Sequence, residues 1–167
     1  MPRGVIDALA EATDLTGVGA VVRTAARRIT GALGATFVLR DGDSCFYADE
    51  DAIAPLWKGQ RFPLATCISG WAMLNMATAI VPDIEDDSRI PIEAYRPTFV
   101  RSLVMVPVGV PEPVAAIGAY WSAPRIPTQA EVNGLEDLAV ATAAATERIG
   151  LSGAPWAPRF GIGAGAT

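Results

Sequence analysis

The stretch from Phe62 to Arg89, FPLATCISGWAMLNMATAIVPDIEDDSR, contains the strongest structural signal in the chain. Residues 62–82 carry no charged side chain, and five acidic or basic residues then follow between Asp83 and Arg89. Such a change is typical of a buried segment that leads into an exposed, hydrogen-bonded loop. Proline, glycine and polar residues interrupt the uncharged run, which favours the core of a soluble domain over a membrane-spanning helix.

The composition of the 167-residue chain favours one globular domain. Apolar residues make up 51% and charged residues 19%, which argues against a disordered chain. The net charge is −5 and no basic cluster occurs, so neither nucleic acid nor an anionic membrane is expected as a partner. No signal-peptide pattern is present, and the two cysteines are expected to be free thiols. We therefore expect a cytoplasmic protein.

The chain contains no histidine. This excludes histidine general-base catalysis, histidine-based nucleophilic triads, a phosphoacceptor histidine and His-ligated zinc or haem. No cofactor is therefore expected from the residues present.

Two helical patterns lie near the ends of the sequence. The first covers residues 5–33, either as one helix that begins near Thr16 or as a short helix followed by a longer one, with a stop at Gly34. The second runs from Gln129 to about Ile149. A T-x-x-E capping box begins it, and its inner stripe is Val132, Leu135, Leu138, Thr142, Ala145 and Ile149.

Short strands and turns lie between these helices. We predict strands at Ala35–Arg40 and Ser44–Ala48, joined across Asp41-Gly42, and then a polar connection at Asp49–Leu56. A weaker strand at Gln60–Leu64, a short helix at Ser69–Met76 with Ser69 as N-cap, and a strand at Ala79–Pro82 follow. The loop at 83–98 has a helical turn near Glu93–Tyr95, and the last two strands are Val100–Val108 and Val114–Ser122. This order predicts an α+β fold. A central antiparallel sheet has the N- and C-terminal helices on one face, and the short helix and loops cover the other. A covered sheet face is a common place for a small-molecule cavity.

Four of these segments resemble the sequence motifs of GAF domains. They are Ile68-Ser69-Gly70-Trp71, AIVPDI at 79–84, RSLVMVPV at 101–108 and AIGAYW at 116–121. The resemblance covers roughly residues 15–150. It is closest to the GAF sensor domains that precede bacterial sensor histidine kinases.

The resemblance implies a PAS-related fold and a cytoplasmic input module of a two-component system, usually dimeric through its terminal helices. Residues 1–14 would be an N-terminal extension or short helix, and residues 151–167 a flexible Gly/Ala/Pro-rich tail or linker. The sequence contains no kinase domain, so we expect a non-catalytic domain that binds an unknown small molecule and regulates an output such as a kinase. The cyclic-nucleotide signature of some members is absent. Bilin attachment at a Cys-His pair is not expected without histidine, and the methionine-sulfoxide-reducing members use three cysteines where this chain has Cys45 and Cys67.

Aromatic and soft side chains are the candidates for lining the cavity. The candidate ligand-binding residues are Tyr47, Cys67, Trp71, Tyr95, Phe99, Met105 and Trp121. The alternative is that they fill the core. Along the last strand Trp121 and Ile117 share one face, while Tyr120 and Gly118 share the other, where Gly118 would let a ligand or backbone come close.

Two further clusters each admit two interpretations. Cys67 lies just before a predicted helix N-terminus, where amide donors can make a thiol reactive, or it is a small buried hydrophobe. A redox switch with Cys45 requires the two sulfurs to approach, and the sequence does not place them together. The acidic loop of Asp83, Glu85, Asp86, Asp87 and Arg89 could bind a cation, but a structural loop with an internal Asp–Arg contact is favoured.

Three functional hypotheses remain open. The first is a sensory domain that forms a homodimer through its terminal helices, where alanine is dense between Ala139 and Ala145, although these helices could simply pack on each other. The second is a thiol-based redox sensor or reductase-like protein that uses Cys67 with Cys45. In the third, side chains fill the cavity and only partner binding remains.

Overall fold

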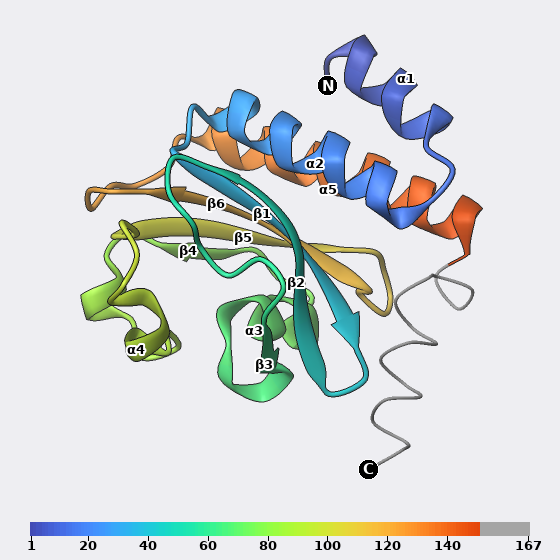
Figure 1. Ribbon diagram of the computed structural model, residues 1–167. Coiled ribbons are helices and arrows are strands. Elements are labelled where there is room, and N and C mark those ends of the chain that lie inside the picture. Colours follow the sequence, from blue (N-terminus) through green and yellow to red (C-terminus); the bar gives the residue numbers. More distant parts are fainter. Residues whose placement is uncertain (151–167) are drawn as a thin grey trace.

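A curved antiparallel sheet forms the centre of the molecule, with its six strands in the order β3-β2-β1-β6-β5-β4 (Figure 1). The structure, a computed structural model, describes residues 1–150, so the predicted tail at 151–167 lies outside the described residues. The strands are β1 (Gly34–Asp41), β2 (Ser44–Ala52), β3 (Arg61–Pro63), β4 (Ala79–Val81), β5 (Ser102–Val108) and β6 (Ala115–Trp121). The helices are α1 (Arg3–Glu11), α2 (Leu15–Thr30), α3 (Ile68–Asn75), α4 (Ile92–Tyr95) and α5 (Gln129–Ile149), with short 3-10 turns at Leu64–Thr66 and Ile84–Asp86.

Helices cover the two faces of the sheet differently. Helices α2 and α5 lie side by side across one face, and α1 lies beyond them, while α3 and α4 lie on the other (Figure 1). The α+β architecture predicted from the sequence is therefore confirmed. Among the described residues no helix is both long enough and apolar enough to cross a membrane.

Two apolar clusters, one on each face, form the core. The helix-side core lies between the sheet and α2 and α5, and it includes Val18, Val22, Phe37, Val106, Ile117, Leu135 and Leu138. The α3-side core lies between the sheet and the α3–α4 layer, and it includes Cys45, Tyr47, Trp57, Cys67, Tyr95, Met105 and Tyr120. Strand residues alternate between the two because successive side chains point to opposite faces.

The N-terminal region contains two helices. Asp14 separates them and caps α2, because its carboxylate accepts a hydrogen bond from the Gly17 amide at 2.8 Å. The predicted stop at Gly34 is wrong: α2 ends at Thr30, and Gly31 takes the left-handed conformation (φ 63°) that glycine adopts without steric cost. Gly34 instead begins β1.

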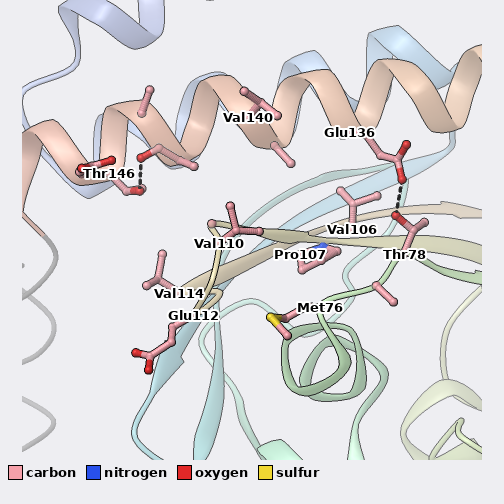
Figure 2. A pocket seen from close by; sticks show the side chains of 16 residues that line it. Met76, Thr78, Val106, Pro107, Val110, Glu112, Val114, Glu136, Val140 and Thr146 are labelled. Atoms are coloured by element: carbon pink, nitrogen blue, oxygen red, sulfur yellow. Dashed lines mark hydrogen bonds between the residues drawn. The ribbon is translucent and has the colours of Figure 1, made fainter.

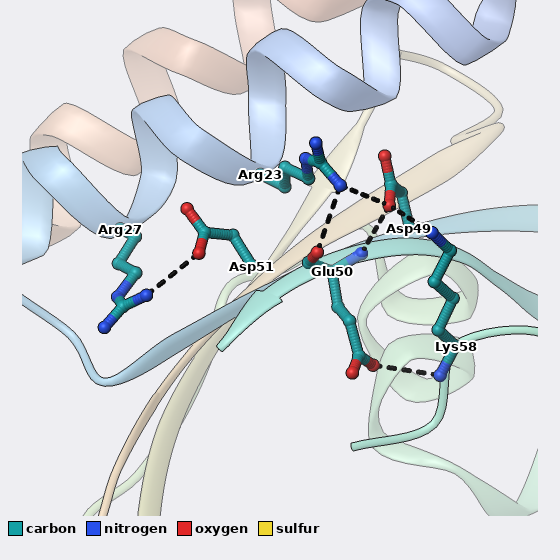
Figure 3. A network of polar contacts seen from close by, with 6 residues as sticks. All are labelled: Arg23, Arg27, Asp49, Glu50, Asp51 and Lys58. Carbon is teal, nitrogen blue, oxygen red and sulfur yellow. Dashed lines mark hydrogen bonds and ion pairs between the residues drawn. The ribbon is translucent and has the colours of Figure 1, made fainter. Parts of the chain in front are cut away.

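Strand β2 is longer than the sequence predicts. Residues 49–52 continue the strand, although their acidic character suggests a polar connection. The carboxylates of Asp49 and Asp51 each pair with an arginine of α2, Arg23 and Arg27 respectively, at 2.9 Å (Figure 3). These ion pairs make acidic residues acceptable in a strand that faces a helix, and they fix α2 against the sheet.

The loop after β2 is held by one carboxylate. Glu50 accepts hydrogen bonds from the backbone amides of Leu56, Trp57 and Lys58 at 2.9–3.0 Å. This closes the loop so that Trp57 turns into the α3-side core.

The C-terminal helix agrees with its prediction. Thr128 and Glu131 form a reciprocal capping box at its start, and the helix runs from Gln129 to Ile149. Five of the six predicted inner-stripe residues are buried, and Ile149 packs at the edge of the helix-side core. Arg148 donates hydrogen bonds to the carbonyls of Leu9 and Ala12 at 2.8 and 2.9 Å, which attaches the end of α1 to α5.

Candidate functional site

Two cysteines that are 22 positions apart in the sequence meet in the α3-side core. Cys45 lies on β2, opposite Phe62 of β3, and Cys67 is the residue immediately before α3. Their sulfur atoms are 3.2 Å apart, and both side chains are buried. The short β3 strand and the turn at 64–66 deliver Cys67 to this position.

Cys67 also caps α3. Its Sγ accepts a hydrogen bond from the Gly70 amide at 3.4 Å, so the predicted N-cap, Ser69, is wrong by two residues. The backbone there leaves no space for a larger residue, because a Cβ on Gly70 would collide with the carbonyl of Leu64. The glycine in the Ile-Ser-Gly-Trp motif therefore permits the 3-10 turn to pack against the helix start.

A line of polar side chains extends from the thiols. Ser69 Oγ lies 3.3 Å from Cys67 Sγ, and the Tyr47 hydroxyl lies 3.1 Å from the same Ser69 Oγ. The sequence predicts Tyr47 and Cys67 at a common site, and the structure brings them together through Ser69. Ser69 itself could not be selected, since a serine in the first turn of a helix is common for structural reasons.

The two thiols differ in their environment. Hydrogen bonds from the Cys45 thiol, the Ser69 hydroxyl and the Gly70 amide lower the pKa of Cys67 below the usual thiol value, although burial opposes the shift. The hydrogen bond with Cys67 and then burial raise the pKa of Cys45. The sulfur–sulfur geometry also allows Cys67 to donate to Cys45. We assign Cys45 as the donor and Cys67 as the acceptor, because Cys67 alone receives the additional backbone donor at the helix start.

Four aromatic rings fill the rest of this face. Trp57 lies at their centre, with ring centroids 5.5 Å from Tyr47, 4.7 Å from Tyr95 and 5.4 Å from Tyr120. The Trp57 indole also donates to the carbonyl of Ala94 at 2.9 Å, which holds α4 over the cluster. Burial raises the pKa of all three tyrosines, so their hydroxyls are neutral.

The space left between these side chains is small. A cavity of about 10 Å³ is lined by Tyr47, Trp57, Phe62, Cys67, Pro91, Ala94 and Tyr95. This is about the volume that one water molecule requires. Occupancy by a metabolite would require the α4 segment or Trp57 to move.

The predicted lining residues are distributed over three environments. Tyr47, Cys67, Tyr95 and Met105 lie in the α3-side core, and Trp71 and Phe99 pack half-buried against it. The placement of Trp121 is wrong: it lies in the helix-side core with Ile117, on the opposite face of β6. The same strand puts Tyr120 on the α3 side, where its hydroxyl is 2.8 Å from Thr36 and occupies the space over Gly118 that we expected a ligand or backbone to use.

Two aromatic residues of this face, Trp57 and Phe62, were not among the residues expected around the cavity. Trp57 follows the predicted polar connection Asp49–Leu56 and lies in no predicted element, and the structure turns it into this face through the contacts of Glu50. The alternation of β6 separates Tyr120 from Trp121, but the sequence does not show which of the two faces the helices.

The acidic loop contains the internal Asp–Arg contact that the sequence favours. Asp87 and Arg89 form an ion pair at 2.7 Å, and Arg89 stacks over the Trp71 ring at 4.3 Å from its centroid. The arginine lowers the pKa of the Asp87 carboxyl. Asp83 in addition lies 3.5 Å from Arg101. Within residues 1–150 no group of three or more His, Cys, Asp or Glu side chains is arranged to hold a metal ion.

A larger groove lies outside the α3-side core. It has a volume of about 920 Å³ and runs between α5, the β5–β6 hairpin and the segment 76–78 (Figure 2). Its walls are mainly apolar, and Val110 and Val140 are 86% and 72% exposed. Glu136 lies at one end, where its carboxylate accepts a hydrogen bond from Thr78 at 2.6 Å. None of the predicted ligand-binding residues lines this groove.

The sheet order and the placement of helices identify the fold by comparison with solved structures. The GAF domain of a phosphoenolpyruvate-protein phosphotransferase from Coxiella burnetii superposes with a TM-score of 0.76 at 13% identity, over 87% of this chain and 90% of that one. This protein has the GAF fold. No protein-family model matches the sequence, and no curated protein matches it.

Other solved structures with the GAF fold carry different functions. The free methionine-R-sulfoxide reductase from Neisseria meningitidis, solved with its substrate, is similar with a TM-score of 0.72 at 21% identity, over 87% of this chain and 85% of that one. The chromophore-binding domain of a bacteriophytochrome from R. palustris has a TM-score of 0.72 at 17% identity, over 88% of this chain and 60% of that one. The GAF fold therefore accommodates both an enzyme and a binding domain, and the site must decide between them.

Proposed function

We propose that this protein is a non-catalytic sensory GAF domain that acts in the cytoplasm and regulates a signalling output such as a bacterial sensor histidine kinase. The support comes from the buried α3-side core, where hydroxyl, thiol and aromatic groups converge on one face of the sheet while helices occupy the other. A change on the α3 side reaches the helices through β2, because Asp49 and Asp51 of that strand pair with arginines of α2. Coupling of this kind requires that the input favour one of two helix arrangements.

The proposed output surface is the helix layer. Val140 is 72% exposed on α5, and Ala144 and Glu147 lie on the same outer side of the helix. Small and apolar residues there permit close approach of a second copy, so the proposal includes a homodimer through the terminal helices. Sedimentation analysis of the protein over a wide concentration range tests this. A Val140→Asp variant is expected to weaken dimerisation, and a protein that remains monomeric at high micromolar concentration contradicts it.

The proposed ligand is a small molecule that enters the α3-side core. A cavity of about 10 Å³ must enlarge to admit one, and the contact to break is the hydrogen bond from Trp57 to Ala94. Native mass spectrometry of freshly purified protein tests for a retained molecule. A mass equal to that of the chain alone, together with no thermal shift from a metabolite panel, would remove the ligand from the proposal.

A second candidate function is thiol-based redox sensing. The 3.2 Å approach of Cys45 and Cys67 favours it, because two thiols so close need little movement to form a disulfide. This candidate requires no cavity for a metabolite. Treatment of the protein with diamide, followed by mass analysis after thiol alkylation, tests it. Two alkylated cysteines after diamide treatment and again after hydrogen peroxide treatment would exclude the redox pair.

A further inference from the structure

The two thiol sulfurs are in direct non-bonded contact. A disulfide has a sulfur–sulfur distance of about 2.05 Å, and the sulfur atoms here are 3.2 Å apart, so they must approach by roughly 1 Å. Rotation of the two side chains can supply this without a change in strand pairing. Cys45 stays fixed because β2 pairs with β3 on one side and with β1 on the other.

The two sulfurs have different access to a reactant. Cys67 is 5% exposed and lines the small cavity, while Cys45 is fully buried behind it and does not line that cavity. Cys67 also accepts the Gly70 amide hydrogen bond, which stabilises a thiolate at that position. These contacts make Cys67 the attacking sulfur and Cys45 the resolving one.

The cavity restricts the size of the reactant. Its volume of about 10 Å³ admits a molecule of the size of water or little more. Tyr47, Phe62 and Trp57 form its walls, and Pro91, Ala94 and Tyr95 cover it from the α4 side. A bulky disulfide or a free amino acid does not fit, whereas hydrogen peroxide and the smallest alkyl hydroperoxides require only a small enlargement of the cavity. The Ser69 hydroxyl, 3.3 Å from Cys67 Sγ, can donate a hydrogen bond to the departing oxygen.

We propose that Cys67 and Cys45 form a hydroperoxide-sensing site, which takes hydrogen peroxide or the smallest alkyl hydroperoxides and stores the signal as a Cys45–Cys67 disulfide. This inference rests on the thiol-sensor candidate above. The Cys67 thiolate attacks the outer peroxide oxygen, the O–O bond breaks, and the remaining oxygen leaves as an alcohol or water after taking up a proton. The Cys67 sulfenic acid then condenses with Cys45: the S–S bond forms, the S–O bond breaks, and water leaves with the Cys45 proton. In total, two thiols and one hydroperoxide give one disulfide, one alcohol or water, and one water.

Disulfide formation changes the start of α3. The Cys67 sulfur moves toward Cys45 and away from the Gly70 amide, which then loses its acceptor. The Trp71 amide keeps its partner, because it donates to the backbone carbonyl of Cys67 at 2.9 Å. Oxidation therefore changes the hydrogen bonding at the N-terminus of α3.

The test uses the whole chain, reduced and then treated with a small excess of hydrogen peroxide. Mass analysis after alkylation is expected to show a protein lighter by two hydrogens with no alkylated cysteine, and a dithiol is expected to restore both sites. Hydrogen exchange is expected to become faster at the Gly70 amide and to remain unchanged at Trp71, its matched control. In a Cys45→Ser variant, dimedone is expected to label Cys67, whereas a Cys67→Ser variant should show no label at Cys45.

A separate variant tests the selectivity for small over bulky hydroperoxides. Trp57→Phe removes the hydrogen bond to Ala94 and loosens the cover, so cumene hydroperoxide, which is bulky, should oxidise this variant faster than the wild type. A disulfide that forms with diamide but not with hydrogen peroxide overturns this inference and leaves the thiol-sensor candidate standing. No disulfide with either reagent overturns both. Dimedone labelling at Cys45 in place of Cys67 overturns the assigned roles.

Discussion

The helix-side core and the α3-side core occupy opposite faces of the same strands, yet they bury different groups. The helix-side core is built almost wholly from aliphatic and alanine side chains, such as Val18, Val22, Leu135 and Leu138. The α3-side core buries both thiols and the three tyrosines, of which Tyr47 and Tyr120 donate or accept hydrogen bonds within it. The α3-side core therefore contains every buried group with redox or acid–base chemistry that the described residues offer.

This difference assigns separate roles to the two faces. Aliphatic packing is non-directional and tolerates small shifts of α2 and α5 as units, whereas hydrogen-bonded thiols and hydroxyls respond to oxidation or to a ligand. The sheet lies between them, and β2 contributes to both: Cys45 points to the α3 side, while Asp49 and Asp51 pair with α2. Under the proposed function, the reactive groups would therefore lie apart from the surface that transmits the signal.

The largest effect is expected from the helix-side core. Leu138→Ala should lower the free energy of unfolding by about 3 kcal/mol, because a fully buried leucine is replaced by a cavity. Urea denaturation measures it, and Asp137→Ala, at an exposed position of the same helix, is the control, expected to change stability by less than about 0.5 kcal/mol. If the two cores are separate, peroxide should still oxidise the folded Leu138→Ala variant at the wild-type rate.

Oxidation should have an effect of similar size, in the opposite direction, and acts on the α3-side core. A Cys45–Cys67 disulfide closes a loop of some twenty residues and should raise the free energy of unfolding by about 3 kcal/mol. Urea titrations of oxidised and reduced protein measure the difference. A variant with both cysteines changed to serine should give the same value under both conditions. An oxidised protein less stable than the reduced one would show that the disulfide strains this face.

The buried hydroxyl pair of the α3-side core gives a smaller effect. Tyr120→Phe should cost about 1 kcal/mol, because it leaves the Thr36 hydroxyl buried without the partner that now lies 2.8 Å away. The Thr36→Val variant and the double variant complete a thermodynamic cycle. The double variant should recover part of the loss, since neither hydroxyl then remains unpaired. Strict additivity would mean that the two hydroxyls do not interact.

The smallest effect is expected at the link between the two faces. Arg27→Met breaks the ion pair with Asp51 at 2.9 Å, in which both side chains are about one third exposed. The cost should be below about 1 kcal/mol and should decrease further at high salt. Arg28→Met, at the exposed neighbouring position, is the control. A much larger loss, or a changed peroxide response, would indicate that this pair couples the two cores.

Periodicity and turn chemistry predict most of the fold. The stripe of α5 and its capping box follow from residue spacing alone, and the Asp41-Gly42 turn places β1 against β2. The errors occur where a distant partner changes the local preference. Acidic residues remain in β2 because α2 supplies arginines, and Cys67 replaces Ser69 as the cap because the 3-10 turn at 64–66 fixes the helix start two residues earlier.

The candidate site is predicted less completely, for a physical reason. Strand alternation separates Tyr120 from Trp121. Because both faces of this strand are apolar, the sequence does not show which face packs against the helices. Trp57 enters the site because the Glu50 carboxylate accepts hydrogen bonds from the consecutive amides of Leu56, Trp57 and Lys58.

By itself the sequence determined the α+β fold, the two terminal helical regions and the lack of histidine chemistry, because these follow from spacing and composition along the chain. Only the tertiary structure decided that Cys45 and Cys67 lie 3.2 Å apart and that aromatic rings leave a cavity of about 10 Å³. Both facts depend on how β2, β3 and α3 pack against one another. Contacts between residues far apart in the chain leave no periodic trace in the sequence, so the chemistry of the α3-side core is visible only once the chain is folded.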